Sequence, residues 1–373
     1  MKILLERGDF LKALSHAQGV VEKRTAVPIL ANVLLEAKDD RLTVTSTDLE
    51  LAVVEVVGAN VETEGRLTVS AHMLFDIVRK LPDGAQISLS HDVEKGRLTI
   101  TAGRGKYELA TLSADEFPRV SVGELPHHLK LDAKQLQRLL ERTRFAMSVE
   151  EAHYTLNGIH LSFQKGDGDA GAVHAAATDT HRLAHSQISV PLSLEATPGI
   201  ILSRKTVTEL QKLLSDASGE VDLSLSDTQV SCAFGDVKLV SRLVDGTFPD
   251  YQGAIPQNNV NRLSLSATPF LKALDRVATL CEEKNKGVRL SLQNDRLTLV
   301  ASGRDAGAAD EEMEVVYDGA PLEVGFNVTY LMDVARQTGE GELIFEFSDT
   351  LSPTLVRDAQ DASTLYVLMP LRV

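Results

Sequence analysis

The sequence predicts an α+β fold of three tandem repeats, each with two helices packed on an antiparallel sheet. The pentapeptide FLKAL at residues 10–14 recurs letter for letter at 270–274, and midway between them residues 135–140 (QLQRLL) have a similar apolar spacing. In each segment a helix, alternating strands, a second helix and further strands follow in the same order. Because strands outnumber helices and no long β-α-β alternation occurs, the pattern disfavours a parallel Rossmann-type sheet.

Apolar residues three and four apart predict the helices. The opening helices are expected at 9–23, 132–148 and 268–283. The second helices are expected at 70–80, 203–214 and 328–337. Between them, runs such as 41–44 (RLTV) and 296–299 (RLTL) alternate polar and apolar side chains, as half-buried strands do. We therefore divide the chain into domains at 1–121, 128–252 and 253–373.

The composition is that of a globular protein with an acidic balance. The chain has 373 residues, of which 43% are hydrophobic, and 38 Lys and Arg against 53 Asp and Glu give a net charge of −15. Only two cysteines, Cys232 and Cys281, are present and they lie far apart, which argues against a disulfide framework or a cysteine zinc site. No apolar run approaches the roughly 18 residues that span a bilayer, and the first residues do not resemble a signal peptide. The expected location is the cytoplasm.

The charge is unevenly distributed along the chain. The six predicted helices, counted with their flanking residues, carry +7, so the remainder carries −22. If the helices of three similar domains lie on one side, they form a cationic surface that contacts phosphates without reading sequence. Aromatic residues make up 5% of the chain and Trp is absent, which disfavours binding of single strands by stacking.

Motifs of catalysis are weak. Residues 166–171 match G-x-G-x-x-G, but a strand pattern follows and not a helix, so a hairpin turn is favoured over a nucleotide site. His174, His181 and His185, with Asp179, form a metal-like cluster. Residues 182–190 alternate like a strand, however, which places His181 and His185 about 13 Å apart and favours structural histidines. With no nucleophile motif and no phosphate loop, we expect a binding protein without cofactor or metal.

Two strand-like segments carry opposite charge. The acidic run 310–314 (DEEME) is predicted to be a solvated edge strand or a surface for a basic partner strand. Residues 104–109 (RGKYEL) provide such a basic strand, with apolar side chains as well.

Eight motifs along essentially the whole chain resemble one known family, the beta sliding clamps of bacterial DNA polymerase III. They are VPILAN (27–32), TDLE (47–50), YTLNG (154–158), ATDTHRLA (177–184), LVDGTFPDY (243–251), KGVRL (286–290), GFNV (325–328) and MPLRV (369–373). The resemblance implies a DNA clamp fold in which two chains close head to tail into a ring whose helices line the hole. It also implies a processivity factor without a catalytic site, which encircles duplex DNA and tethers the replicative polymerase.

The resemblance also implies three sets of functional residues. The DNA-facing set is Arg24, Arg79, Tyr154, Arg204 and Lys205. The pocket for short linear peptides of the polymerase, the clamp loader and other proteins is Leu156, Thr178, His181, Arg182, Leu183, Pro249, Leu351, Val367, Met369, Pro370, Leu371 and Arg372. The dimer interface is Arg104, Lys106, Tyr107, Leu109, Thr279, Leu280, Asp310, Glu311 and Glu312.

Four positions depart from the family pattern. His72 replaces a basic residue and Glu150 a polar amide, which puts DNA contact there in doubt. Gly253 replaces an arginine at the pocket rim, and Thr279 replaces a larger aliphatic residue at the interface. Two other hypotheses remain open on the residues alone. One is a metal-dependent hydrolase that uses the histidine cluster, and the other is a scaffold that binds proteins but no DNA.

Overall fold

The computed structural model describes residues 1–23, 25–165, 170–191, 197–281, 286–303 and 307–372. The contacts divide the chain into two compact units. Unit 1 comprises Met1–Gln137 and Lys205–Leu243, and unit 2 comprises Arg138–Arg204 and Val244–Val373. Each unit is described by itself below.

Unit 1 is built on one antiparallel sheet of thirteen strands, in the order β10-β15-β16-β17-β4-β3-β2-β6-β9-β8-β7-β1-β5. Its strands are β1 (Lys2–Glu6), β2 (Asn32–Lys38), β3 (Arg41–Thr47), β4 (Leu51–Gly58), β5 (Asn60–Thr63), β6 (Gly65–Ser70), β7 (Gln86–Asp92), β8 (Arg97–Ala102), β9 (Gly105–Leu112), β10 (His127–Asp132), β15 (Glu220–Leu225), β16 (Gln229–Phe234) and β17 (Val237–Arg242). Pairing of β17 with β4 joins strands that are far apart in the sequence.

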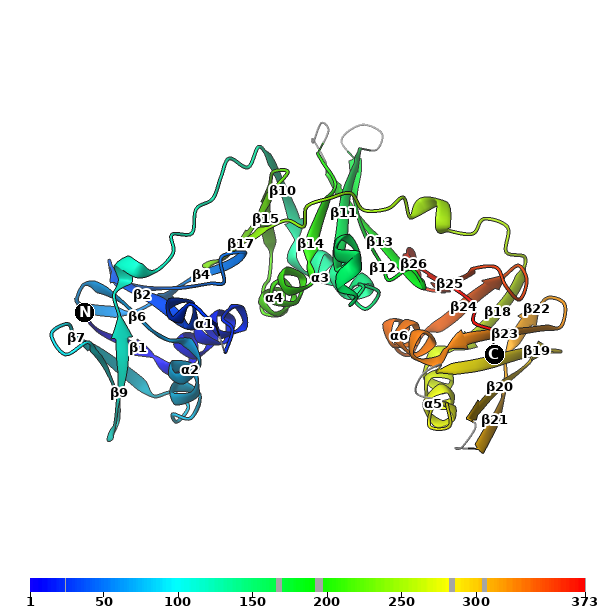
Figure 1. The fold of residues 1–373 in the computed structure, drawn as a ribbon, viewed down its shortest axis with the longest axis horizontal. Coiled ribbons are helices and arrows are strands. Elements are labelled where there is room, and N and C mark those ends of the chain that lie inside the picture. Colours follow the sequence, from blue (N-terminus) through cyan, green and yellow to red (C-terminus); the bar gives the residue numbers. More distant parts are fainter. Residues whose placement is uncertain (24, 166–169, 192–196, 282–285, 304–306, 373) are drawn as a thin grey trace. The chain divides into compact units, whose positions relative to one another are not determined.

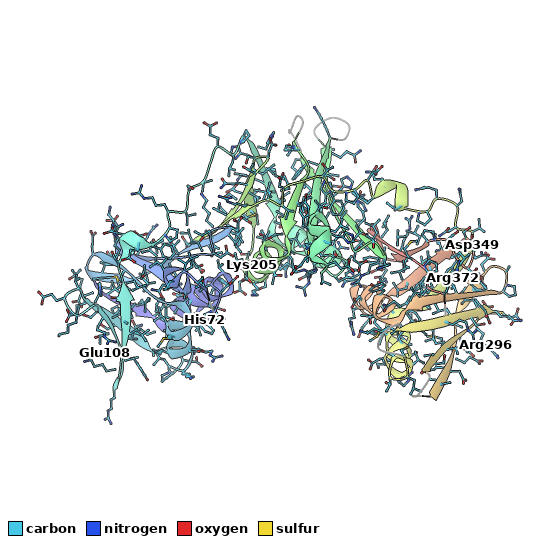
Figure 2. All side chains as sticks on the ribbon, in the orientation of Figure 1. His72, Glu108, Lys205, Arg296, Asp349 and Arg372 are labelled. Carbon is cyan, nitrogen blue, oxygen red and sulfur yellow. The ribbon has the colours of Figure 1, made fainter. Side chains whose placement is uncertain are left out.

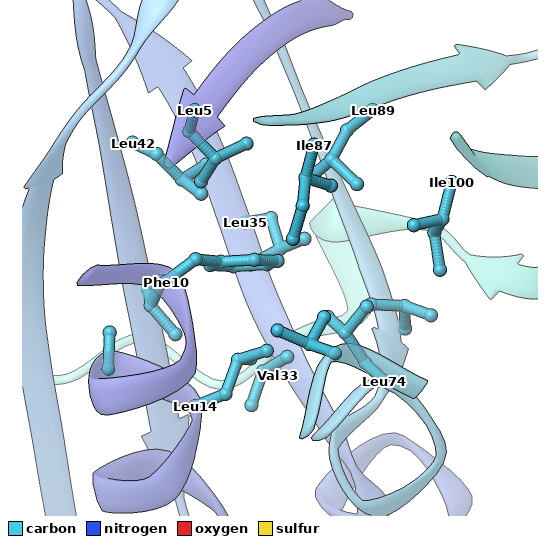
Figure 3. Packing of buried hydrophobic residues seen from close by; sticks show 14 of the residues in the cluster. Leu5, Phe10, Leu14, Val33, Leu35, Leu42, Leu74, Ile87, Leu89 and Ile100 are labelled. Carbon is cyan, nitrogen blue, oxygen red and sulfur yellow. The ribbon is translucent and has the colours of Figure 1, made fainter. Parts of the chain in front are cut away.

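Two helices of unit 1, α1 (Arg7–Val20) and α2 (Ala71–Arg79), lie side by side against this sheet (Figure 1). The Glu6 carboxylate accepts hydrogen bonds from the first amides of α1, and the Ser70 hydroxyl caps α2. Figure 3 shows Phe10 and Leu14 of α1 and Leu74 of α2 packed against strand side chains such as Leu35. The apolar spacing of the helices therefore decides which faces are buried.

Unit 2 contains two antiparallel sheets. The larger has the order β14-β11-β12-β13-β26-β25-β24-β18-β22, and the smaller has the order β21-β20-β19-β23. The larger sheet consists of β11 (Gly158–Lys165), β12 (Ala170–Thr178), β13 (Arg182–Pro191), β14 (Ile200–Ser203), β18 (Asn261–Ser266), β22 (Val316–Asp318), β24 (Glu342–Phe347), β25 (Thr354–Asp358) and β26 (Asp361–Leu368). The smaller consists of β19 (Gly287–Gln293), β20 (Arg296–Gly303), β21 (Gly307–Glu314) and β23 (Leu322–Asn327).

The six predicted helices are confirmed, with differences at their ends. Helices α5 (Ala267–Ala278) and α6 (Val328–Thr338) pack on each other in unit 2, and the division between the units falls within α3 (Ala133–Arg144) and α4 (Arg204–Ser215). The predictions of helix to 23, 148 and 283 were too long, since α1, α3 and α5 end at Val20, Arg144 and Ala278. Short 3-10 helices are η1 (Pro28–Ala31), η2 (Ala114–Glu116), η3 (Glu151–Leu156) and η4 (Gln252–Ala254).

The end of α3 has a tertiary cause. After Arg144 the hydrogen bonds join residues three apart and no longer four apart. The Ala146 amide donates to the Thr143 carbonyl, and the Met147 amide donates to the Arg144 carbonyl. The Ser148 amide then bonds to the Leu156 carbonyl, which belongs to the segment before β11. The bond between Ser148 and Leu156 joins residues eight positions apart and follows no helical spacing, so apolar spacing alone overextends the helix.

The internal repeat corresponds to equivalent buried positions. Phe10, Ala13 and Leu14 of α1 are buried, as are their FLKAL counterparts Phe270, Ala273 and Leu274 of α5. In α3, Leu136, Leu139 and Leu140 are buried too. The letters shared by α1 and α5, and the similar apolar spacing in α3, therefore mark the same packing face in three helices.

The strand predictions around the weak motifs are confirmed where the residues are described. Residues 166–169 of the G-x-G-x-x-G match lie outside the described residues. The flanking strands β11 and β12 pair as an antiparallel hairpin, with Lys165 opposite Gly171. The acidic run lies in β21, at an edge of its sheet, and the basic run lies largely in β9.

Three histidines share one face of the larger sheet in unit 2. His160 on β11 lies opposite Ala176 on β12, and Ala176 lies opposite His185 on β13. His174 on β12 is next to His185, with 3.1 Å between His174 Nδ1 and His185 Nε2. Of the predicted cluster of His174, His181, His185 and Asp179, the structure brings His174 and His185 together, whereas His181 and Asp179 lie in the turn between β12 and β13. Among the described residues, no group of three or more His, Cys, Asp or Glu side chains is placed to hold a metal ion.

The segment that follows β17 packs its aromatic rings on these histidines. Phe248 stacks on His160 at 4.9 Å between ring centroids, nearly parallel, and the Tyr251 ring lies 5.7 Å from that of His185. Burial, reinforced by the neighbouring His174, lowers the pKa of His185 from 6.5 to about 4. The packing therefore requires neutral imidazoles.

None of the helices in the described part of the chain is both long and apolar enough to cross a bilayer.

The free energy of unfolding should fall as the pH is lowered from about 6.5 to about 4. In this window the unfolded chain binds a proton at residue 185 that the folded chain does not, because its folded pKa is depressed to about 4. His185→Gln should remove about 3 kcal/mol of this pH dependence, since one pKa unit corresponds to about 1.4 kcal/mol. Chemical denaturation between pH 8 and pH 4 measures it, with His153→Gln, at an exposed position, as the control. Identical pH profiles for wild type and His185→Gln would contradict the assignment.

Candidate functional site

The residues predicted to bind peptides lie in unit 2, and we call all twelve the candidate peptide site. Leu156, Leu183 and Val367 are buried together in one apolar cluster. We call this cluster the floor of the site. The sequence missed five of its members, Ala176, Ile201, Phe248, Tyr251 and Leu355. The two aromatic residues could have been noticed, because they occur in an aromatic-poor chain at a Gly- and Pro-containing segment.

Pairing of β13 with β26 assembles the floor. Leu183 lies opposite Val367, and Arg182 lies opposite Leu368. One residue beyond the paired strands, the Met369 amide donates to the His181 carbonyl at 2.9 Å. The chain end is then fixed by a bond from the Leu371 amide to a β23 carbonyl at 2.8 Å. Residues almost 190 positions apart are thus brought together by backbone hydrogen bonds.

Two residues of the candidate peptide site are exposed apolar side chains on segments that adjoin strands of the floor, Leu351 before β25 and Met369 after β26. Leu351 is 63% exposed and Met369 is 40% exposed. The loop that carries Leu351 is fixed by Asp349, whose carboxylate accepts bonds from the Leu351 and Ser352 amides and from the Ser352 hydroxyl. The bond from the Ser352 hydroxyl and those from the two amides lower the pKa of Asp349. Asp349 and the exposed Arg372 are labelled in Figure 2. Exposed Leu and Met beside a buried apolar floor suit an apolar ligand.

The segment 244–251 forms a further side of the site. Pro249 is exposed between the buried Phe248 and Tyr251. Gly246 has φ +114°, and a Cβ there would lie 2.8 Å from Thr155 Cγ2, so this close approach requires glycine. The glycine also brings the segment against the η3 loop that carries Tyr154.

The side chain of Arg182 differs from the expectation. The structure places its backbone at the floor, but its guanidinium is directed to Asp179 and Asp333, with N···O distances of 2.9 and 2.7 Å. Thr178 stands on the same turn, with its hydroxyl donating to the Arg182 carbonyl at 2.6 Å.

The predicted DNA-facing residues lie at helix ends and on one loop. Arg24 lies outside the described residues. Arg79 is exposed at the end of α2, where it pairs with Asp76 at 2.9 Å, and Tyr154 is 58% exposed in η3. Arg204 and Lys205 start α4. The Arg204 guanidinium donates to the Met147 and Ser148 carbonyls at 3.0 and 2.6 Å, and Lys205, labelled in Figure 2, pairs with Asp48. The last two cations therefore also have structural partners.

Three of the four departures have structural explanations. His72 bridges α2 to α1 through contacts of 3.1 Å to the Gln18 side chain and to the Val21 carbonyl. Glu150 precedes η3 and pairs with His153 at 3.4 Å. Thr279 ends α5, with its hydroxyl 3.4 Å from a carbonyl one turn earlier. Nothing lies within 4 Å of a Cβ built at Gly253, so the structure does not explain that glycine.

The residues predicted for the dimer interface lie on two strands and one helix end. In β9, Lys106 and Tyr107 are exposed and Leu109 is buried, while Arg104 lies in the preceding turn. Along residues 105–110 this strand pairs only with β8, since its pairing with β6 involves Thr111 and Leu112. In β21, Glu311 forms an ion pair with Arg276 of α5, and Glu312 forms one with Arg296 at 3.2 Å. Asp310 of the same strand is exposed. Thr279 and Leu280 follow the end of α5. Both strands therefore present backbone edges among the described residues.

The cationic character of the helices persists with their observed bounds. α1 carries +1, α3 carries +3, α4 carries +2 and α5 carries +1, while α2 and α6 are neutral. The total is +7, as the sequence predicted with longer helices. The rest of this acidic chain therefore carries a net charge of −22, since the whole chain carries −15.

Comparisons with known proteins agree over the whole chain. Family models of the DNA polymerase III beta subunit match at residues 1–121 for the N-terminal domain, 130–250 for the central domain and 252–372 for the C-terminal domain. The beta sliding clamp of Caulobacter vibrioides is 44% identical over 373 residues. Those of Pseudomonas aeruginosa and Escherichia coli are 36% and 33% identical over 374 residues. Each alignment covers 100% of both chains.

Solved structures give the same result. A sliding clamp from Bartonella birtlesii bound to griselimycin matches with a TM-score of 0.95 at 41% identity, and a clamp from Caulobacter crescentus matches with 0.92 at 44%, each covering 100% of both chains. The predicted fold class is confirmed by these matches together with the antiparallel sheets and their helices. The chain therefore belongs to the DNA polymerase III beta subunit family, and its function is that of a DNA sliding clamp, a processivity factor without catalytic activity.

Proposed function

We propose that two copies of this chain close into a ring around duplex DNA and tether the replicative polymerase to it. The observation that carries the proposal is the separation of charge, with +7 on six helices of a chain whose net charge is −15. Cationic helices that line the hole attract phosphates without reading sequence, and an anionic exterior discourages DNA from binding outside. Because leaving one phosphate is offset by meeting the next, such contacts permit sliding.

We propose the domain division 1–121, 128–252 and 253–373, with ring closure at the two strand edges. β9 of one chain would pair with β21 of the other, which joins the basic run to the acidic run. Opposite charge and unpaired backbone groups on both strands support this contact. The site of action would be the cytoplasm, with no cofactor required.

We propose Arg24, Arg79, Tyr154, Arg204 and Lys205 as the residues that face DNA. Exposure supports both Arg79 and Tyr154, and position at the end of α2 further supports Arg79. Arg204 and Lys205 would contribute positive potential while they hold the α3–η3 turn and Asp48.

We propose that the candidate peptide site binds short linear segments of the polymerase, the clamp loader and other proteins. Its buried apolar floor and the exposed Leu351 and Met369 support an apolar anchor as the main recognition element. Two structural relatives, from B. birtlesii and P. aeruginosa, are bound to griselimycin. We propose that griselimycin also binds the candidate peptide site of this chain.

Topological binding should be visible in a loading assay. The protein should have the mass of two 40.5-kDa chains in solution and, after loading by a clamp loader, should remain on nicked circular plasmid at high salt. Cutting the plasmid should release it, because nothing but the closed ring holds it there. Retention after linearisation would contradict encirclement, and so would a monomer at micromolar concentration.

Removing a phosphate contact should change the salt dependence of DNA binding. For Arg79→Gln, the slope of log K against log salt for duplex DNA should become shallower by about 0.9. Lys95→Gln is the matched control, because Lys95 also pairs with an aspartate three residues away in unit 1. Equal slopes for the two variants would remove Arg79 from the DNA-facing set.

Truncating an exposed side chain of the peptide site should weaken ligand binding without loss of stability. Leu351→Ala should reduce griselimycin affinity by about 1 to 2 kcal/mol, roughly 5- to 30-fold in Kd, measured by isothermal titration calorimetry. The control is Val260→Ala in the same unit, where the side chain is 79% exposed. Unchanged affinity in Leu351→Ala would show that the ligand binds elsewhere.

A further inference from the structure

We propose that Arg182 is a positioning residue that fixes the candidate peptide site to helix α6 and does not itself contact the ligand. The inference rests on the proposed function of that site. It reassigns the partly buried arginine of the set from recognition of the ligand to organisation of the floor.

All three nitrogens of the guanidinium already donate within the protein. Nε donates to Asp179 Oδ2 at 2.9 Å, Nη1 to Asp333 Oδ2 at 2.7 Å and Nη2 to the Phe145 carbonyl at 2.7 Å. The side chain is 10% exposed. A planar fork that satisfies three acceptors in different directions leaves little freedom to turn toward a ligand.

Two aromatic rings fix the plane of the fork. The guanidinium carbon lies 4.2 Å from the Tyr330 ring centroid and 5.2 Å from that of Phe145. Tyr330 and Asp333 belong to α6, and Phe145 follows α3. Arg182 thus ties the start of β13 to α6 and to the turn after α3.

The backbone of the same residue belongs to the floor of the site. Its amide donates to Asp179 Oδ1 at 3.0 Å, and in the sheet it lies opposite Leu368. Leu183 follows it directly, and the preceding carbonyl, of His181, holds the Met369 amide. A displacement of Arg182 would therefore move both the floor and one exposed side of the site.

A second turn in unit 1 shows that the arginine is not needed to form this backbone. Residues 47–51 repeat the hydrogen bonds of residues 178–182. The Thr47 hydroxyl donates to the Leu51 carbonyl at 2.9 Å, and the Leu51 amide donates to Asp48 Oδ1 at 2.7 Å. The middle residues, Leu49 and Thr180, share a positive φ, of 80° and 75°. Leucine occupies the position of Arg182 there. The turn is thus an autonomous motif, and the guanidinium serves the connection to α6.

The test measures griselimycin binding at a residue outside the site. Asp333→Asn removes the charge that receives Arg182 Nη1, and it should weaken binding about tenfold, within the range by which residues away from a site modulate affinity. Arg182→Lys should weaken binding similarly, because one ammonium group cannot bond three acceptors in a plane. The double variant should lose little more than either single variant. Arg336→Ala, which removes the other arginine on Asp333, is the matched control and should bind normally.

Each outcome is decisive when Kd is measured well below the melting temperature of every variant. Weakened binding in Arg182→Lys with normal binding in Asp333→Asn would show direct contact with the ligand and overturn the proposal. Lowered melting temperatures with unchanged Kd would reduce Arg182 to a stabilising role and overturn it too. Absence of binding by the wild type would instead reject the candidate peptide site itself, and the positioning role with it.

Discussion

Backbone pairing between strands far apart in the sequence is the constraint on which both units depend. In unit 1, β4 pairs with β17, and in unit 2, β13 pairs with β26, so the edge strand of one repeat is covered by a strand of the next. An edge strand exposes a row of donors and acceptors, and covering it removes a site of unwanted association. The second of these pairings also creates the candidate peptide site, because it places Leu183 beside Val367. The candidate peptide site is thus a by-product of joining two repeats.

The helices and the repeat could be predicted because they depend on local patterns. Apolar spacing located all six helices, and FLKAL marked the face that α1 and α5 bury. The end of α3 could not be predicted in the same way, since it depends on Arg182 and Arg204 bonding to carbonyls after the helix. Tertiary partners that have no fixed spacing leave no periodic signal.

The candidate site was predicted by resemblance, and the geometry refines it. Resemblance placed Arg182 among ligand-contacting residues, yet its side chain meets Asp333 on α6. It omitted Phe248 and Tyr251, whose stacking on histidines depends on three strands being adjacent. The net charge of the whole chain argued against a DNA-binding protein. The division of that charge, positive on the helices and negative on the rest of the chain, argued for one.

The double use of the floor has a consequence for resistance to inhibitors. Leu156, Leu183 and Val367 are buried against other side chains of this chain, so smaller residues there leave cavities in the protein itself. Substitution of Leu351 or Met369 should cost little stability, because both side chains are exposed. Variants that escape a ligand should therefore accumulate at the exposed rim, while the floor stays unchanged as a target. Few resistance substitutions should therefore be tolerated against an inhibitor that gains most of its affinity from contacts with the floor.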